Sequence, residues 1–82
     1  MAERDQILER LYVHLRPLTP AHVELTPETD LVGTLGLDST TVINIVLDVE
    51  DEYDVSVPLN ALADIRTAGE LADLIHRLCE DG

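Results

Sequence analysis

Aliphatic side chains recur every three or four residues in three stretches of this chain, and this spacing limits the folds open to it. The interval matches the turn of an α-helix, so each stretch would bury one apolar stripe. With no Trp, no Phe and only two Tyr in 82 residues, the core must be aliphatic, which suits helix packing. We predict an all-α fold, a four-helix bundle with three main helices and one short helix, in a single domain over residues 1–82.

Helix-breaking and helix-capping residues give the expected bounds of the first two helices. The first is expected from Glu3 to Leu15, since Pro17 disfavours helical geometry in the residue before it. The second is expected to begin at Asp38, a good N-cap residue, or at the residue after it, and to end near Tyr53. The connection between these helices is long and rich in Pro and Gly, and long ordered loops are often functional.

The second half of the chain should hold the remaining helices. Residues 55–58 are expected to be extended and to lead into a short helix or turn within residues 59–65. The last helix is expected to begin at Thr67, which forms a T-x-x-E capping box with Glu70. The predicted core contains Leu8, Leu11, Leu15, Val46, Val49, Leu71, Leu74 and Ile75.

The charge of the chain is strongly acidic, with 17 Asp and Glu against 5 Lys and Arg and a net charge of −12. Binding to nucleic acid requires clustered basic residues, so neither nucleic acid nor an anionic membrane surface is an expected partner. An acidic surface instead favours basic partner proteins. No apolar run reaches the ~20 residues of a membrane span, and the start of the chain is charged. We therefore expect a cytoplasmic monomer.

The stretch Leu35-Gly36-Leu37-Asp38-Ser39 carries the most specific chemical signal. Ser39 would lie at the N-terminus of the second helix, after a glycine-containing loop, with its hydroxyl facing solvent. Free backbone amides and the positive end of the helix dipole would lie beside that hydroxyl, and both favour a phosphate ester there. Taken alone, the Asp-Ser pair is more typical of a simple helix cap.

Read together with its surroundings, this motif resembles the start of the second helix in the acyl carrier protein family. The other matching features are an acidic helix end with an aromatic residue, an extended piece with a proline, and a capped final helix: Glu50-Asp51-Glu52-Tyr53, Val57-Pro58 and Thr67 through Ile75. The resemblance implies that a phosphopantetheinyl transferase attaches 4'-phosphopantetheine from coenzyme A to Ser39. It further implies that Asp38 assists this transferase.

The resemblance implies a carrier and not an enzyme. The chain would hold an acyl intermediate as a thioester on its arm and deliver it to partner enzymes. The implied partners are the transferase, an acyl- or aminoacyl-activating ligase, and a ketosynthase, acyltransferase or condensation-type enzyme. Ile43 and Leu47 follow Ser39 on its face of the helix, and they are expected to dock partners together with Thr40, Glu50 and Asp51. Alternatively, Ile43 and Leu47 pack against the long loop.

Departures from the family pattern bear on the pathway. Thr40 stands where Leu usually follows the modified serine, and Thr41 and Asn44 replace acidic residues that are frequent early in this helix. Gly33 and Thr34 stand where acidic residues often precede the motif. These changes weaken the acidic docking patch near the arm. They favour a specialised pathway, such as polyketide or non-ribosomal peptide synthesis, over general fatty acid synthesis.

Other interpretations remain open at this point. A stand-alone aminoacyl or peptidyl carrier is one, although the Gly-Gly-x-Ser motif of peptidyl carriers is absent. An unmodified acidic helical interaction module is another, and it leaves the serine motif unexplained. A serine hydrolase would need one of His14, His22 and His76 as its base, and the chain has no G-x-S-x-G elbow. No metal site is expected, because His76 and Cys79 lack two further ligands.

Overall fold

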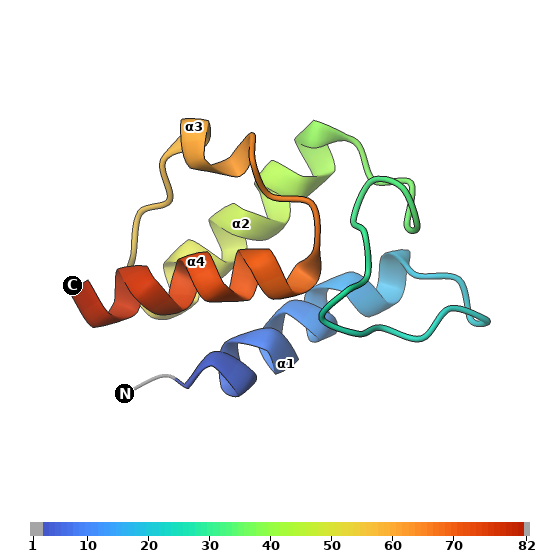
Figure 1. The fold of residues 1–82 in the computed structure, drawn as a ribbon, viewed down its shortest axis with the longest axis horizontal. Coiled ribbons are helices and arrows are strands. Elements are labelled where there is room, and N and C mark those ends of the chain that lie inside the picture. The colour runs from blue at the N-terminus through green and yellow to red at the C-terminus, as the bar shows by residue number, and fades with distance from the viewer. Residues whose placement is uncertain (1–2, 82) are drawn as a thin grey trace.

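The computed structural model describes residues 3–81 of the chain, and this part is helical. Its elements are α1 (Arg4–Leu15), the 3₁₀ turn η1 (Arg16–Leu18), α2 (Ser39–Tyr53), α3 (Leu59–Leu62) and α4 (Ala68–Asp81) (Figure 1). Three long helices and one short helix confirm the predicted fold class. Pairing of β type within residues 3–81 is limited to one isolated bridge between Asp30 and Thr67.

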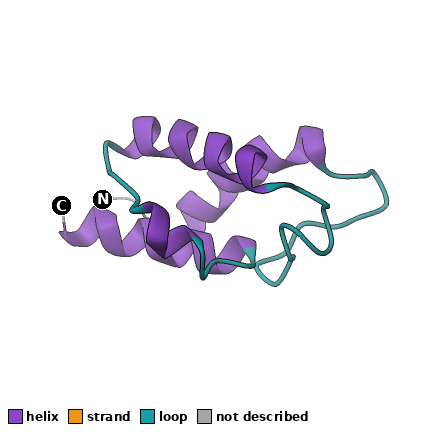
Figure 2. Ribbon diagram, turned by 90° about the horizontal axis from the view of Figure 1, so that it is seen from above, coloured by secondary structure: helices purple, strands orange, loops and turns teal. Residues whose placement is uncertain are grey.

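The core lies between α1, α2 and α4 and is aliphatic, as the composition requires. In Figure 1, α1 and α4 lie side by side, α2 crosses behind α4, and α3 lies on the opposite side from α1. All of the predicted core residues are buried. The long loop adds three more buried leucines, Leu31, Leu35 and Leu37, and Figure 2 shows this loop at one end of the bundle. None of the helices in residues 3–81 combines the length and apolarity needed to cross a bilayer.

Capping boxes define where α1 and α4 begin. The predicted box of α4 is present, since the Glu70 amide donates to Thr67 Oγ1 at 3.2 Å and the Thr67 amide donates to Glu70 Oε1 at 3.0 Å. The helix begins one residue after Thr67, as this box requires. A second box, between Glu3 and Gln6, opens α1. Its E-x-x-Q pattern is visible in the sequence, but Glu is a less common cap than Ser, Thr or Asp.

The long loop is fastened to the start of α4 by backbone hydrogen bonds. The Ala68 amide donates to the Thr29 carbonyl at 3.1 Å, and the Gly69 amide donates to the Pro27 carbonyl at 2.8 Å. These amides belong to the first turn of α4, where a helix offers no partner of its own. A Cβ atom on Gly69 would lie 2.8 Å from the Pro27 carbonyl oxygen, so glycine permits this close approach. These hydrogen bonds hold the loop against α4 before the chain enters α2.

Candidate functional site

Ser39 is the first residue of α2, and its side chain is exposed. The residue before it, Asp38, is the N-cap: its backbone is extended, and its Oδ1 accepts from the Thr41 amide at 2.8 Å. Capping is thus performed by Asp38, as predicted. The Ser39 hydroxyl is left at the surface, beside the first-turn amides and the positive end of the α2 dipole.

Asp38 is an anion next to that hydroxyl. Hydrogen bonds from Thr41, through its side chain and then its backbone amide, lower the pKa of the Asp38 carboxyl below its ordinary value. The carboxylate is exposed, so its second oxygen can meet a partner. A cation that approaches Ser39 would therefore find one negative ligand beside the hydroxyl.

The turn before α2 explains why Ser39 faces outward. Gly36 has φ +68°, a left-handed conformation that glycine adopts without steric cost, and its amide donates to the Val32 carbonyl at 2.9 Å. Leu35 and Leu37, on either side of it, are buried in the core. The two leucines anchor the turn, and the chain leaves it with Ser39 directed to solvent.

An apolar groove of about 430 Å³ opens beside Ser39. Ser39 is its only polar lining residue, and the groove lies where the long loop, α2 and the α3 region meet. The lining residues are Leu31, Val32, Ser39, Val42, Ile43, Leu59, Leu62, Ala63 and Ile65. Val32 is 59% exposed and Leu59 is 69% exposed, so these two apolar side chains form the rim. Sequence reasoning missed both as site residues, because only the folded chain brings them to Ser39.

The five predicted docking residues occupy different environments. Thr40, Leu47 and Asp51 are exposed along α2, and Leu47 is 52% exposed. Ile43 is half-buried and lines the groove with Ser39. Glu50 is also half-buried, and its carboxylate accepts from a backbone amide of the extended segment after α2 at 2.9 Å. The docking role of these residues stays a prediction.

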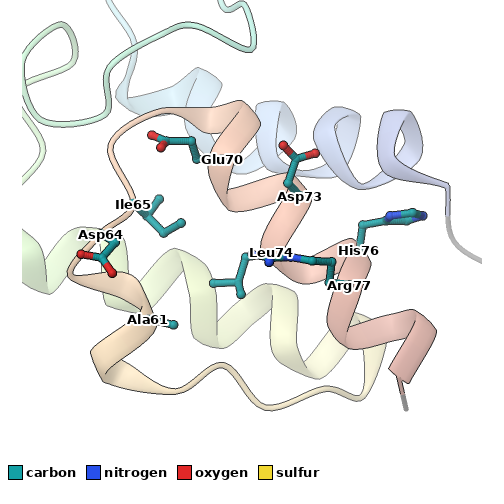
Figure 3. Close-up of a pocket in the computed structure, with 8 residues that line it drawn as sticks. All are labelled: Ala61, Asp64, Ile65, Glu70, Asp73, Leu74, His76 and Arg77. Atoms are coloured by element: carbon teal, nitrogen blue, oxygen red, sulfur yellow. The ribbon is translucent and has the colours of Figure 1, made fainter.

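A second groove, of about 610 Å³, lies between the α3 region and α4 (Figure 3), and Ser39 is not among its lining residues. Ile65 and Leu74 are apolar residues of its lining, while Asp64, Glu70 and Arg77 give it charges of both signs. None of the predicted site residues lines it. Nothing in this mixed lining selects one class of ligand.

Two of the three histidines, His14 and His76, lie beside carboxylates. His14 Nε2 is 2.8 Å from Glu52 Oε2, and His76 Nε2 is 3.2 Å from Glu80 Oε1. None of His14, His22 and His76 lines the groove beside Ser39, so none is placed as a base for it. Within residues 3–81, no group of three or more His, Cys, Asp and Glu side chains is arranged to hold a metal ion.

Comparison with known proteins identifies the family. Residues 9–75 match the family model described as the phosphopantetheine attachment site. A protein of Rhodococcus erythropolis named acyl carrier protein is 33% identical over 82 residues, which is all of this chain and 84% of that protein. The chain belongs to the acyl carrier protein family. The cofactor of this carrier is therefore covalently attached 4'-phosphopantetheine, as the resemblance implied.

Other relatives match a shorter part of the carrier. A probable acyl carrier protein of Caulobacter vibrioides is 41% identical over 56 residues, or 68% of this chain and 65% of that protein. A meromycolate extension acyl carrier protein of Mycobacterium tuberculosis is 38% identical over 58 residues, or 71% of this chain and 50% of that protein. The matched part of the carrier thus spans about half to two thirds of these relatives.

A solved structure supports the fold independently. A Mycobacterium tuberculosis structure described as that of an acyl carrier protein superposes with a TM-score of 0.70 and covers 93% of this chain. The sequence identity in this pair is 24%, and the match covers 97% of the solved chain. Carriers of this family interact with phosphopantetheinyl transferases and with biosynthetic enzymes.

Proposed function

We propose that this chain is a single-domain acyl carrier protein that holds an acyl intermediate as a thioester on a 4'-phosphopantetheine arm attached to Ser39. The observation that carries the proposal is the exposed Ser39 hydroxyl at the first residue of α2, beside an apolar groove. The other serine of the chain, Ser56, is also exposed but lies in the extended segment after α2, without a helix N-terminus.

The residues around Ser39 suit a phosphodiester. The first-turn amides and the α2 dipole stabilise negative charge at this end of the helix. Asp38 keeps an ionised carboxylate next to the hydroxyl, and we infer that it assists the transferase, whose reaction uses magnesium. The arm, when attached, supplies the thiol that holds the acyl group. The chain itself catalyses no step: it positions the arm and presents the cargo to other enzymes.

The groove favours an acyl cargo over an aminoacyl cargo. Its lining is apolar except for Ser39, so a hydrocarbon chain that enters it is stabilised by about 0.8 kcal/mol for each buried CH₂ group. An ammonium group would lose its hydration there without gaining a hydrogen-bond partner. Loading the arm with octanoyl should therefore raise the thermal midpoint, whereas glycyl should leave it near that of the unloaded carrier. A higher thermal midpoint for the glycyl-loaded carrier than for the octanoyl-loaded carrier would favour the aminoacyl alternative.

We further propose that the carrier serves a specialised pathway. Support comes from the uncharged Thr40, Thr41 and Asn44 at the arm end of α2, and from relatives that are named for meromycolate extension. The partners would be an activating ligase and a ketosynthase, acyltransferase or condensation-type enzyme of that pathway. Enzymes of general fatty acid synthesis should elongate cargo on this carrier poorly, and efficient elongation would refute this part of the proposal.

The attachment site can be tested directly by intact mass. The chain is incubated with a broad-specificity phosphopantetheinyl transferase, coenzyme A and magnesium. We expect a mass gain of one phosphopantetheine in the unaltered chain and in the control Ser56→Ala, and no gain in Ser39→Ala. A mass gain that persists in Ser39→Ala, or one that is lost in Ser56→Ala, would show that the arm is attached to a residue other than Ser39. No gain in any variant would leave only an acidic helical module.

A further inference from the structure

A third groove, of about 670 Å³, lies between α1 and the first part of the long loop. Figure 1 shows this loop turning back along α1 after η1. The third groove shares no lining residue with the groove beside Ser39. We call it the α1 groove, and among its lining residues are Glu9, Tyr12, Arg16, Ala21, Glu24 and Leu25.

Both walls of the α1 groove are held in place by the fold. Thr19 Oγ1 donates to the Leu15 carbonyl at 2.7 Å, which fastens the start of the loop to the end of α1. Tyr12 is 8% exposed, and Leu25 packs against the core, so the floor of the groove is apolar and fixed. An occupant would therefore meet a preformed groove, which lowers the entropic cost of binding.

Three charged side chains line the α1 groove, and none of them forms an ion pair within residues 3–81: Glu9, Arg16 and Glu24. All three residues are exposed. The charges of the second groove are engaged instead, since Glu70 caps α4 and Asp73 is in an ion pair with α1. The charges of the α1 groove are thus available to an occupant.

The spacing of residues along α1 sets the length of that occupant. Glu9, Tyr12 and Arg16 are three and four residues apart, so they lie on one face of the helix. Arg16 keeps helical backbone angles, and the helical rise places it about 10 Å from Glu9 along the axis. An extended chain advances about 3.3 Å per residue, so about three residues of it span this distance.

The electrostatic potential in the α1 groove is negative in spite of Arg16. Burial raises the pKa of the Tyr12 hydroxyl, and the charges of Glu9 and Glu28 raise it further. Glu9 and Glu24 outnumber Arg16 in the lining, and the whole chain has a net charge of −12. A basic occupant is therefore attracted, whereas a second copy of the chain is repelled.

We propose that the α1 groove binds a short extended segment of a partner protein in which basic and apolar residues alternate. Successive side chains of an extended segment point to opposite sides, so the apolar ones can face Tyr12 and Leu25 while the basic ones reach the rim. There the basic side chains would pair with Glu9 and Glu24. Arg16 would donate to a carbonyl of the segment.

This binding would leave Ser39 accessible, because the two grooves share no lining residue. A partner could then hold the carrier by α1 while the arm on Ser39 visits other enzymes. The second statement rests on the proposed function of Ser39, whereas binding in the α1 groove does not.

The test uses the peptide Leu-Lys-Leu-Lys-Leu with blocked ends, titrated into the isotope-labelled full chain at about 0.1 M NaCl. Shifts of the amide signals in NMR spectra give both the site and the Kd. We expect the largest shifts within residues 9–25, and no saturable shifts with Leu-Glu-Leu-Glu-Leu. Largest shifts in α2 would overturn the proposal, as would a Kd weaker than about 1 mM.

Two pairs of substitutions separate the groove from the net charge. Glu9→Gln with Glu24→Gln should raise the Kd of the lysine peptide about five- to tenfold, because two ion pairs are lost. Asp48→Asn with Asp51→Asn removes the same charge from exposed positions of α2 and should raise it about twofold or less. Equal effects of the two pairs would mean that only the net charge attracts the peptide, which would refute the groove as its site.

A second comparison blocks the groove without altering its carboxylates. Ala21 is exposed and lines the α1 groove, so Ala21→Arg should raise the Kd about tenfold by steric and charge repulsion. Thr34→Arg adds the same charge at an exposed loop position outside the groove and should change the Kd about twofold or less. Thermal unfolding of each variant checks that the fold is kept. Self-association of the chain without peptide, lost in Ala21→Arg, would make a second copy the occupant and overturn the proposal.

Independence from Ser39 is tested with the carrier after phosphopantetheine has been attached. Its Kd for the lysine peptide should equal that of the unmodified chain to within about twofold. Loss of binding on attachment would refute the statement that a partner can hold the carrier while the arm is in use. A chain that gains no phosphopantetheine but binds the peptide would refute the proposed function and leave the α1 groove as a binding site.

Discussion

At the scale of single residues, Asp38 combines a structural role with a proposed functional one. Its Oδ1 accepts from the Thr41 amide, which starts α2, and its charge lies next to the Ser39 hydroxyl. Two substitutions separate these roles, since Asn can cap a helix as well as Asp can, whereas Ala cannot.

The expected results of these two substitutions differ. Asp38→Ala should lower the thermal midpoint by several degrees, whereas Asp38→Asn should leave it nearly unchanged at neutral pH. Both should slow modification of Ser39 if the charge assists the transferase. Circular dichroism and the transferase assay measure the two effects, and normal modification of Asp38→Asn would limit Asp38 to capping.

Asp54 provides a second prediction at this scale. It ends α2 with φ 55° and ψ 49°, the left-handed conformation in which a side chain costs energy and glycine does not. We expect Asp54→Gly to raise the free energy of unfolding by about 0.5–1 kcal/mol in urea denaturation. Asp54→Ala should lower it, since Asp tolerates this conformation better than Ala. A loss of stability in the glycine variant would contradict the argument.

The ends of the helices could be predicted from the sequence because local residues set them. Asp38 and the Thr67–Glu70 box predicted helix starts that agree with the structure to within one residue. α1 ends at Leu15 as expected, but the reason given for this end was wrong: Arg16, before Pro17, keeps helical angles of φ −53° and ψ −46°, and Pro17 continues the chain as the 3₁₀ turn η1. The rim of the groove beside Ser39 could not be predicted, because Val32 and Leu59 come from separate elements that meet only in the folded chain. The contact of Glu50 with the Val57 amide was missed for the same reason. Ser39 could be named from sequence only through its motif.

At the scale of elements, an ion-pair cluster joins α1 to α2. Arg10 donates to both Glu52 oxygens, at 2.8 and 3.0 Å, and His14 Nε2 lies 2.8 Å from Glu52 Oε2. Arg10, followed by His14, holds the pKa of the Glu52 carboxyl below its ordinary value. The Glu52 side chain is 29% exposed, so solvent screens the cluster in part.

Removal of the Glu52 charge should weaken this junction. We expect Glu52→Gln to lower the free energy of unfolding at pH 7 by about 0.5–1 kcal/mol. A lowered pKa means that the stabilisation is present above the unfolded value, about 4.3, and is lost as pH falls through the lower folded value. The free energies of unfolding of Glu52→Gln and of the unaltered chain should therefore converge as the pH falls below that value. Asp51→Asn, an exposed carboxylate on the same helix, serves as the control and should not lose stability.

Gly69 tests the attachment of the long loop to α4. Helix propensity alone predicts that Gly→Ala in a helix stabilises by about 0.5–1 kcal/mol. The structure predicts the opposite sign, because the added Cβ would lie 2.8 Å from the Pro27 carbonyl oxygen, a backbone atom. We expect Gly69→Ala to lower the free energy of unfolding by about 1–3 kcal/mol. A stabilised variant would show that the loop does not approach α4 so closely.

At the scale of the whole molecule, the excess of negative charge opposes the compact state. The chain has 17 carboxylates against 5 Lys and Arg, within extents of 36 × 24 × 19 Å. Ion pairs such as Arg10–Glu52 offset only a few of these charges. The remaining carboxylates repel one another, and unfolding separates them.

Salt should therefore stabilise this carrier. Between about 0.01 M and about 0.1 M NaCl the Debye length falls from about 30 Å to about 10 Å. The first value exceeds the two shorter extents of the molecule, 24 and 19 Å, and the second is smaller than both. Screening then weakens the long-range repulsion more than the contact ion pairs, so the thermal midpoint should rise by several degrees. The triple variant Asp48→Asn, Asp51→Asn and Asp54→Asn lacks part of the densest acidic cluster. Its thermal midpoint should therefore be higher at about 0.01 M NaCl and should rise less as salt is added. A midpoint that falls with salt would mean that ion pairs outweigh the repulsion.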